Sequence, residues 1–297
     1  MAIPTIIDTP ADMRGWSRNV KRAGSSPHAD RRIALVPTMG ALHAGHLALI
    51  EAAHSLADVV VVSIFVNPLQ FGESIDFTGY PRPIDADLAA CAEAAVDVVY
   101  APSASVMYPS GFDTRVLPGR LATMIEGSSR PGHFEGVATV VTKLIAAVMP
   151  DVAVFGEKDF QQVAVVRRMV ADLDLGVEVV GCPTVRELDG LALSSRNQRL
   201  TSPQRAAAAV IPLAIEQARR TARRSDASVG DIIGAATSVV AAEPLASLDY
   251  VSVFDAGSLD LVETIIDADR MCGRYRIAIA ARFGDVRLID NADLFAR

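Results

Sequence analysis

The stretch Val36-Pro37-Thr38-Met39-Gly40-Ala41-Leu42-His43-Ala44-Gly45-His46-Leu47 decides the fold that this sequence predicts. It continues an apolar run, residues 33–36, that indicates a buried strand, and a helix is expected to open at about Gly45. A strand, a glycine-containing turn and a helix N-terminus together form a phosphate-binding arrangement, because the helix dipole and unpaired backbone N–H groups attract anions. The stretch therefore predicts a nucleotide site.

Two histidines, His43 and His46, lie in this turn where a bound triphosphate would be placed. Gly45 between them carries no side chain, so a nucleotide can approach the backbone closely. From these residues alone three interpretations are open: adenylate chemistry, a structural role at a helix start, or a metal site. Zinc needs three or four ligands, and no Cys or His cluster elsewhere supplies the rest. The preceding strand favours adenylate chemistry.

Composition limits the class of protein. The 297 residues can form two hydrophobic cores, and 51% hydrophobic with 21% charged residues is typical of a soluble globular chain. A net charge of −7 argues against a nucleic-acid partner, and the arginine pairs are interpreted as solvated faces. Three widely spaced cysteines, no signal-like N-terminus and no apolar run long enough to span a bilayer predict a cytoplasmic protein without a membrane partner.

Strand-like and helix-like segments alternate over the first 185 residues. Strands are expected at 33–36, 59–66, 97–100, 152–155 and 177–180, and helices at about 10–24, 45–56, 85–95, 137–148 and 160–173. The stretch 101–135 has little periodicity and is expected to be a loop region over the site. This alternation predicts an α/β fold, a Rossmann-like parallel sheet with helices on both faces, whose ligand lies at the carboxyl ends of the strands.

A smaller α+β domain is expected over residues 186–297, forming a lid over the site of a first domain that spans 1–185. An alanine-rich helix should start at Ser202-Pro203, with Ser202 as N-cap, and a second helix near Val229. Residues 248–254 alternate like a strand, and 274–281 with 285–289 predict an antiparallel hairpin around Phe283-Gly284.

Polar residues follow other predicted strands. Asn67 and Gln70 follow the strand at 59–66, Lys158 and the pair Gln161-Gln162 follow the strand at 152–155, and Ser194-Ser195-Arg196 lies near the domain boundary. Each has an ordinary alternative: a turn at Asn67-Pro68, a surface lysine, an exposed helix start, and a helix cap. Their shared position favours a site for phosphoryl-type transfer, which needs positioning and charge stabilisation more than a protein nucleophile.

The runs PTMGALHAGH (37–46), FVNPLQF (65–71), YPR (80–82), GEKDFQQ (156–162) and DGLALSSRNQRL (189–200) occur in an order that resembles the pantothenate synthetase (pantoate–β-alanine ligase) family. The resemblance covers nearly the whole chain. It implies a HIGH-motif nucleotidyltransferase that is dimeric through its N-terminal domain. The implied reaction forms pantoyl adenylate and pyrophosphate from ATP and pantoate, after which β-alanine displaces AMP to give pantothenate.

The resemblance also assigns residues. The implied catalytic residues are His46, the proton-donor position, with His43, Lys158, Ser194, Ser195 and Arg196. The implied ATP site consists of Met39, Gly40, Ala41, Leu42, His43, Ala44, Gly45, His46, Gly156, Glu157, Lys158, Asp159, Val185, Leu193, Ser194, Ser195 and Arg196. The implied substrate residues are Gln70 and Gln162 for pantoate, with Gln70 also near β-alanine, then Asn67, Tyr80, Arg130 and His133, the last two on a loop that closes over the adenylate.

Two positions depart from the family pattern. Leu193 stands where methionine is common, a tolerated apolar exchange. Some relatives have adjacent acids beside the metal, whereas this chain has Asp85-Ala86-Asp87, so Mg²⁺ is expected mainly on phosphate oxygens, with Asp87 the one candidate protein ligand. The rival functions are another HIGH-motif nucleotidyltransferase, and a regulatory protein that binds nucleotide without turnover.

Overall fold

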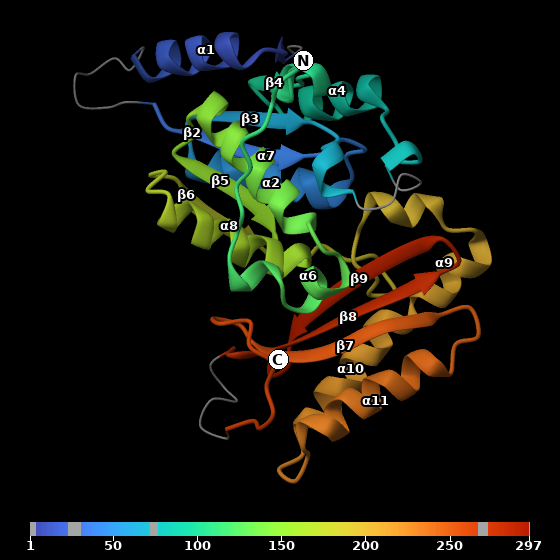
Figure 1. Ribbon diagram of the computed structural model, residues 1–297. Coiled ribbons are helices and arrows are strands. Elements are labelled where there is room, and N and C mark those ends of the chain that lie inside the picture. The colour runs from blue at the N-terminus through green and yellow to red at the C-terminus, as the bar shows by residue number, and fades with distance from the viewer. Residues whose placement is uncertain (1–3, 23–30, 72–76, 267–272, 297) are drawn as a thin grey trace. The chain divides into compact units, whose positions relative to one another are not determined.

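The structure is a computed structural model, and it describes residues 4–22, 31–71, 77–266 and 273–296. By their internal contacts the residues form two compact units (Figure 1). The first consists of Met1–Glu157 and Gln161–Pro183, and the second of Lys158–Phe160 and Thr184–Arg297. The short segment Lys158–Phe160, which the sequence placed in the first domain, therefore has most of its contacts in the second unit.

The first unit is built on a six-stranded parallel sheet in the order β1-β4-β3-β2-β5-β6. The strands are β1 Thr5–Ile7, β2 Ile33–Thr38, β3 Val59–Ile64, β4 Val98–Tyr100, β5 Val152–Gly156 and β6 Glu178–Cys182. From β2 the chain moves outward through β3 and β4, then returns to add β5 and β6 on the other side of β2. The strand order thus reverses between β2 and β5, the place where open α/β sheets bind ligands.

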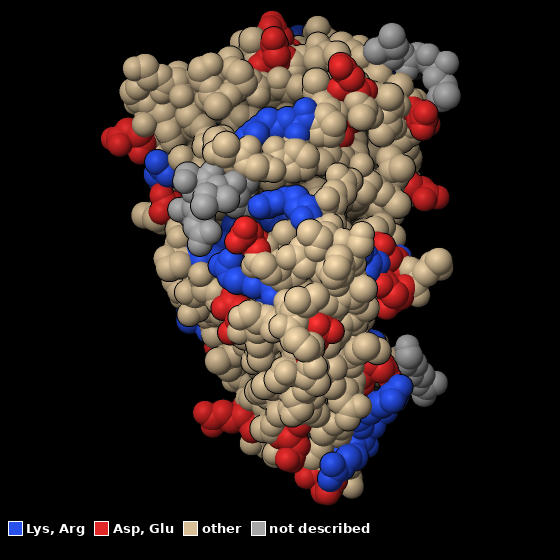
Figure 2. Space-filling model, turned by 90° about the vertical axis from the view of Figure 1, so that its right-hand side faces the viewer, with Lys and Arg blue, Asp and Glu red and all other residues tan. Residues whose placement is uncertain are grey.

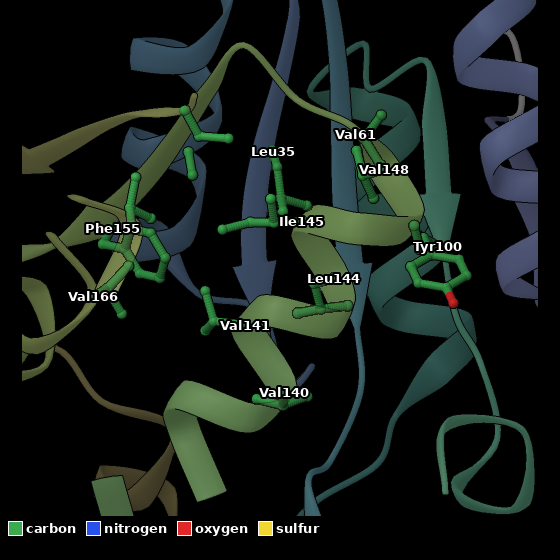
Figure 3. Close-up of a cluster of buried hydrophobic side chains, with 14 of the residues drawn as sticks. Leu35, Val61, Tyr100, Val140, Val141, Leu144, Ile145, Val148, Phe155 and Val166 are labelled. Atoms are coloured by element: carbon green, nitrogen blue, oxygen red, sulfur yellow. The ribbon is translucent and has the colours of Figure 1, made fainter. Parts of the chain in front are cut away.

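Helices cover both faces of this sheet. They are α1 Pro10–Arg22, α2 Ala44–Leu56, α4 Ile84–Glu93, α5 Ala104–Met107, α6 Ile125–Ser129, α7 His133–Val148 and α8 Phe160–Asp172, with 3-10 turns at Pro68–Gln70 (η1), Arg120–Ala122 (η2) and Glu157–Asp159 (η3). Because side chains alternate along a strand, Leu35 packs in the core beneath α7, and its neighbours Ala34 and Val36 pack in a separate core with α2. Figure 3 shows α7 side chains over Leu35 and Val61.

The expectation that residues 101–135 form a loop region is wrong. The region contains α5, η2 and α6, and α7 begins at His133, four residues before the expected start of that helix at 137. Helices of four or five residues, such as α5 and α6, are too short for an apolar period to become visible in the sequence. Their ends are instead held by individual side chains, as where Ser103 Oγ accepts from Val106 N at 3.3 Å.

The second unit is a three-stranded antiparallel sheet with packed helices. Its strands are β7 Ser247–Asp255, β8 Tyr275–Phe283 and β9 Val286–Asp293, in the order β7-β8-β9, and its helices are α9 Ser202–Ala208, α10 Val210–Ala222 and α11 Val229–Ala241, with a 3-10 turn at Ser195–Arg199 (η4). The hairpin turn holds Gly284 at φ +61°, a conformation that favours glycine. The predicted fold class, a Rossmann-like α/β sheet with a smaller α+β part, is confirmed.

Two details of the second unit differ from expectation. Thr201 and not Ser202 is the N-cap of α9, because its side chain accepts from Gln204 N. The alanine-rich helix also divides into α9 and α10 near Ala209. Pro212 explains the break, since it has no N–H to continue the hydrogen bonding of α9.

One arginine of each of three pairs in the sequence, Arg31-Arg32, Arg219-Arg220 and Arg223-Arg224, has an acidic partner. Arg32 lies 3.3 Å from Glu178, Arg220 lies 3.2 Å from Glu216, and Arg224 lies 2.9 Å from Asp226. Figure 2 shows the same pattern, with carboxylates interspersed among Lys and Arg on the face it draws. In the part of the chain that the structure describes, no helix is long and apolar enough to cross a bilayer.

Candidate active site

The turn after β2 is held by the side chains of Thr38 and Asp87. Thr38 Oγ1 donates to Ser63 O at 2.8 Å and accepts from Gly40 N at 3.1 Å. Gly40 has φ +80° and Ala41 has φ +51°, so two successive residues adopt the left-handed conformation. A Cβ on Gly40 would lie 2.8 Å from Asp87 Oδ2, so only glycine fits this position.

Asp87, from the first turn of α4, is the support beneath this turn. Its side chain accepts from Ala41 N at 2.9 Å through Oδ2 and from Leu42 N at 2.7 Å through Oδ1, and the residue is 2% exposed. Both oxygens are thus engaged by the backbone, and no group of three or more metal-ligating side chains occurs among the described residues. The geometry assigns Asp87 to holding the turn, and it adds nothing in favour of the expected metal role.

His43 and His46 cap the start of α2 reciprocally. Nδ1 of His43 accepts from Gly45 N at 3.2 Å, and Nδ1 of His46 accepts from His43 N at 3.3 Å. The two rings lie 4.1 Å apart between centroids. Because each Nδ1 acts as an acceptor, the ring hydrogen of each neutral histidine is on Nε2. The two histidines therefore have the structural role at a helix start, and the same hydrogen bonds orient their two Nε2–H donors.

The expectation of open backbone N–H groups in this turn is wrong for most of them. Gly40, Ala41, Leu42 and Gly45 donate to side chains, as described above, and the N–H groups of His46 and Leu47 donate to His43 O. Ala44 is the first residue of α2. An anion at this turn would consequently meet the histidine rings and the helix dipole more than open backbone N–H groups.

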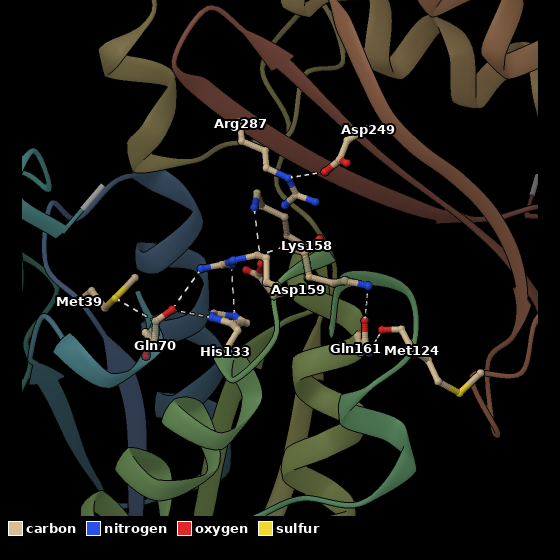
Figure 4. A network of polar contacts seen from close by, with 11 residues as sticks. Met39, Gln70, Met124, His133, Lys158, Asp159, Gln161, Asp249 and Arg287 are labelled. Atoms are coloured by element: carbon tan, nitrogen blue, oxygen red, sulfur yellow. Dashed lines mark hydrogen bonds and ion pairs between the residues drawn. The ribbon is translucent and has the colours of Figure 1, made fainter. Parts of the chain in front are cut away.

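Asn67, Gln70 and Met39 are joined by side-chain hydrogen bonds, of which Figure 4 shows the one between Gln70 and Met39. Asn67 caps η1, and its Nδ2 donates to Gln70 Oε1 at 3.0 Å. Gln70 Nε2 in turn lies 3.1 Å from Met39 Sδ, in the turn after β2. The first unit therefore brings a residue assigned to ATP against a residue assigned to pantoate. The alternative that Asn67-Pro68 forms a turn is also correct.

Arg130 and His133 contact the backbone carbonyl of Gln70. Arg130 Nη2 lies 3.2 Å and His133 Nδ1 lies 2.8 Å from Gln70 O, as Figure 4 shows for the histidine. A carbonyl oxygen only accepts, so Nδ1 of His133 carries a hydrogen. His133 is the first residue of α7 and Arg130 follows the last residue of α6, so both lie at helix ends and not on an irregular loop.

The remaining substrate candidates of the first unit differ in burial. Tyr80 is buried, with its ring 5.8 Å from that of Phe71 in an edge arrangement. Gln161 is structural: Oε1 accepts from Glu126 N, and Nε2 donates to Leu121 O and Met124 O. Its neighbour Gln162 is half-buried, and no hydrogen bond of its side chain to a described residue is present. The two glutamines therefore differ in their hydrogen bonding, although they are adjacent in the sequence.

Gly156 ends β5, and Glu157, Lys158 and Asp159 form η3 directly after it. Lys158 Nζ lies 3.7 Å from Asp159 Oδ1. In the second unit, Lys158 O accepts from Asn291 Nδ2 at 2.8 Å, and Asn291 Oδ1 accepts from Arg276 Nη2 at 2.6 Å. The sequence gives no sign of this support, because Asn291 and Arg276 lie on the terminal hairpin, far along the chain from Lys158.

The Ser-Ser-Arg run lies in a short hydrogen-bonded segment of the second unit. Leu193 N donates to Val185 O at 3.0 Å, which joins two of the expected ATP residues. Ser194 Oγ accepts from Arg196 N at 3.2 Å and caps η4, so the alternative interpretation as a cap is correct for Ser194. Ser195 is buried. The cap holds the backbone that carries Arg196.

Comparison with known proteins identifies the family. The family model described as pantoate-beta-alanine ligase matches residues 5–293. Pantothenate synthetase from Heliobacterium modesticaldum is 49% identical over 286 residues, covering 96% of this chain and 98% of that protein. The crystal structure of pantothenate synthetase from Thermus thermophilus has a TM-score of 0.87 at 43% identity, covering 98% of this chain and 100% of that one.

A third relative has a solved structure with ligands. Pantoate-beta-alanine ligase from Francisella tularensis, complexed with beta-gamma ATP and beta-alanine, has a TM-score of 0.77 at 34% identity and covers 99% of each chain. The matches span the turn after β2, the Asn67–Gln70 segment, η3 and the Ser-Ser-Arg run in a single alignment of nearly full length. The chain therefore belongs to the pantoate–β-alanine ligase family.

Proposed function

We propose that this chain catalyses the ATP-dependent condensation of pantoate with β-alanine to give pantothenate, AMP and pyrophosphate through an enzyme-bound pantoyl adenylate. The family match over residues 5–293 supports the reaction, and the Francisella tularensis relative is described in complex with ATP and β-alanine. The single observation that carries the proposal is the contact of Gln70 with Met39, since it joins the pantoate residue to the nucleotide turn.

The first step forms a bond between a pantoate carboxylate oxygen and the α-phosphorus of ATP, and the bond to the β-phosphate breaks with release of pyrophosphate. The Nε2–H groups of His43 and His46 are the donors for oxygens on which charge builds. Lys158, Ser194, Ser195 and Arg196 act on the triphosphate, and the remaining ATP residues shape the site. Donors already oriented by hydrogen bonds need no rearrangement as charge develops, which lowers the barrier.

In the second step the neutral amine of β-alanine attacks the acyl carbon, AMP leaves with the bonding electrons, and the amine loses a proton. Gln70 and Gln162 hold pantoate, because a substrate with two hydroxyls and a carboxylate suits neutral groups that both donate and accept. Tyr80 lines the same region. The hydrogen bonds of Asn67, Arg130 and His133 to Gln70 favour a role in placing Gln70 over direct substrate contact.

Mg²⁺ is proposed to accompany ATP and to be held mainly by phosphate oxygens, since both carboxylate oxygens of Asp87 already accept hydrogen bonds from the turn. We further propose a homodimer formed through the N-terminal unit, as the family resemblance implies, and a cytoplasmic location, as the three widely spaced cysteines favour. The C-terminal unit is proposed to act as a lid. Sedimentation velocity tests the dimer: a monomer at micromolar concentration contradicts it.

The adenylate intermediate is tested by isotope exchange. Labelled pyrophosphate should enter ATP when enzyme, Mg²⁺ and pantoate are present without β-alanine, because adenylate formation is reversible before the amine attacks. Omission of pantoate is the control and should abolish the exchange. Rapid pantothenate synthesis with no pantoate-dependent exchange would contradict the two-step mechanism. Exchange without any subsequent response to β-alanine would favour another nucleotidyltransferase activity.

A further inference from the structure

Tyr108 lies outside every set of residues assigned to the reaction, yet its hydroxyl makes a direct contact with one of them. The phenol oxygen donates to Asn67 Oδ1 at 2.7 Å. The ring lies against Phe65 at 6.0 Å and Phe112 at 4.9 Å between centroids, so it has a fixed place. Burial raises the pKa of Tyr108 above its usual value, and the hydroxyl therefore remains a donor at physiological pH.

The hydrogen bonds of Asn67 define which way its amide faces. Oδ1 accepts from Tyr108 and from Leu69 N at 3.2 Å, while Nδ2 donates to Gln70 Oε1 and to Gly136 O, both at 3.0 Å. Asn67 is 1% exposed, and each of its two side-chain polar atoms has two protein partners. The amide is consequently saturated by protein groups, and it is suited to orienting Gln70 rather than to binding substrate.

The orientation passes on to Gln70. With Nδ2 of Asn67 facing Gln70 Oε1, the carboxamide of Gln70 must turn its Nε2 the other way, toward Met39 Sδ. Close packing preserves this arrangement: a Cβ on Gly136 would lie 2.3 Å from Leu69 O, so α7 lies directly against η1. A change in the orientation of the Asn67 amide is therefore expected to change the orientation of the Gln70 NH₂ group, because the close packing leaves little room for other adjustment.

We propose that Tyr108 is a positioning residue for pantoate: its hydroxyl fixes the Asn67 amide, which turns the Gln70 NH₂ group toward Met39, so that one N–H contacts Met39 Sδ and the second N–H donates to an oxygen of the substrate. The inference rests on the proposed function, because it assigns pantoate to Gln70. An aromatic ring at this position needs no hydroxyl for packing. The hydroxyl is thus the feature with a functional consequence, and Tyr108→Phe removes it alone.

Steady-state kinetics of four variants tests the proposal. Tyr108→Phe should raise the KM for pantoate about tenfold, the usual size of one hydrogen bond lost from an orienting network, with the KM for ATP within about twofold of wild type. Gln70→Ala should raise the pantoate KM further, and the double variant should match Gln70→Ala because the two residues act in one chain. Tyr100→Phe is the matched control, since among the described residues this buried hydroxyl has one hydrogen-bond partner, Met107 Sδ at 3.8 Å.

The outcomes separate the two levels of inference. A wild-type pantoate KM in Tyr108→Phe beside an impaired Gln70→Ala overturns the positioning role and leaves the proposed function standing. Effects of Tyr108→Phe and Gln70→Ala that multiply in full also overturn it. An equal rise in both KM values with a lower melting temperature marks a structural role and overturns it as well. If Gln70→Ala leaves the pantoate KM unchanged, the assignment of Gln70 and the inference built on it both fail.

Discussion

Asp87→Asn isolates the carboxylate that holds the nucleotide turn, because it keeps the size of the side chain and removes its charge. Asp87 accepts from Ala41 N at 2.9 Å and Leu42 N at 2.7 Å. Asparagine keeps one acceptor and places an NH₂ group against the other N–H, so one charge-assisted hydrogen bond is lost, about 2 kcal/mol. Ala41 at φ +51° needs this support, since the left-handed conformation is unfavourable for alanine.

A loss of about 2 kcal/mol corresponds to roughly a 30-fold rise in the KM for ATP, with the KM for pantoate changed much less. The assay is pantoate-dependent pyrophosphate release at varied ATP, with a thermal melt to confirm folding. Asp85→Asn is the matched control, because Asp85 lies in the same first turn of α4 and is exposed. It should behave like the wild type.

The same variant separates a turn-holding role from a metal-binding role. If Asp87 only holds the turn, raising the Mg²⁺ concentration should not restore Asp87→Asn. Restoration of activity by Mg²⁺, with a shifted Mg²⁺ requirement, would show that Asp87 is a metal ligand. An ATP KM within twofold of the wild type would refute the positioning argument altogether.

Three further predictions concern different parts of the chain. His46→Ala should slow pantoate-dependent pyrophosphate release at least ~100-fold, and a near-normal rate would contradict its role as a donor. Gln161→Ala removes the hydrogen bonds from Gln161 to Glu126 N, Leu121 O and Met124 O and should lower the melting temperature, whereas Gln162→Ala should keep the melting temperature and raise the pantoate KM; the reverse pattern would exchange their roles. The hydrogen bond from Arg205 lowers the pKa of Asp189, so this carboxylate stabilises the native state above its unfolded pKa and ceases to do so as the pH falls through its folded pKa. The melting-temperature difference between the wild type and Asp189→Asn should therefore be full at neutral pH and shrink as the pH is lowered from about 4, and a constant difference would contradict the linkage.

The sheet and the turn between β2 and α2 could be predicted because their signals are local. Strands buried on both faces are apolar at nearly every residue, as at β3 Val59–Ile64, and a glycine-containing turn before a helix is recognisable by itself. Short elements could not be predicted in this way. The helices within 101–135 have no period to detect, and what holds α6 is the side chain of Gln161 from another helix.

Site residues were predicted by type, and their tasks depend on contacts that sequence spacing does not reveal. Asp87 was a candidate metal ligand because some relatives have acids beside the metal in this segment, whereas its oxygens lie against backbone N–H groups of Ala41 and Leu42. Likewise, Arg130 and His133 were expected to bind substrate, whereas their side chains contact the backbone carbonyl of Gln70. The sequence did not indicate the contact of Asn291 with Lys158 or that of Tyr108 with Asn67, because the two residues of each pair are far apart in the sequence and meet only in the folded chain.

The most direct test of the proposed reaction is the release of AMP and pyrophosphate from ATP, Mg²⁺ and D-pantoate, measured with and without β-alanine. The proposed ligase should release AMP steadily only when both substrates are present, with one pantothenate formed per AMP. Pyrophosphate release that does not depend on β-alanine would favour another nucleotidyltransferase activity. ATP binding without turnover in either mixture would contradict the ligase and support a regulatory nucleotide-binding protein.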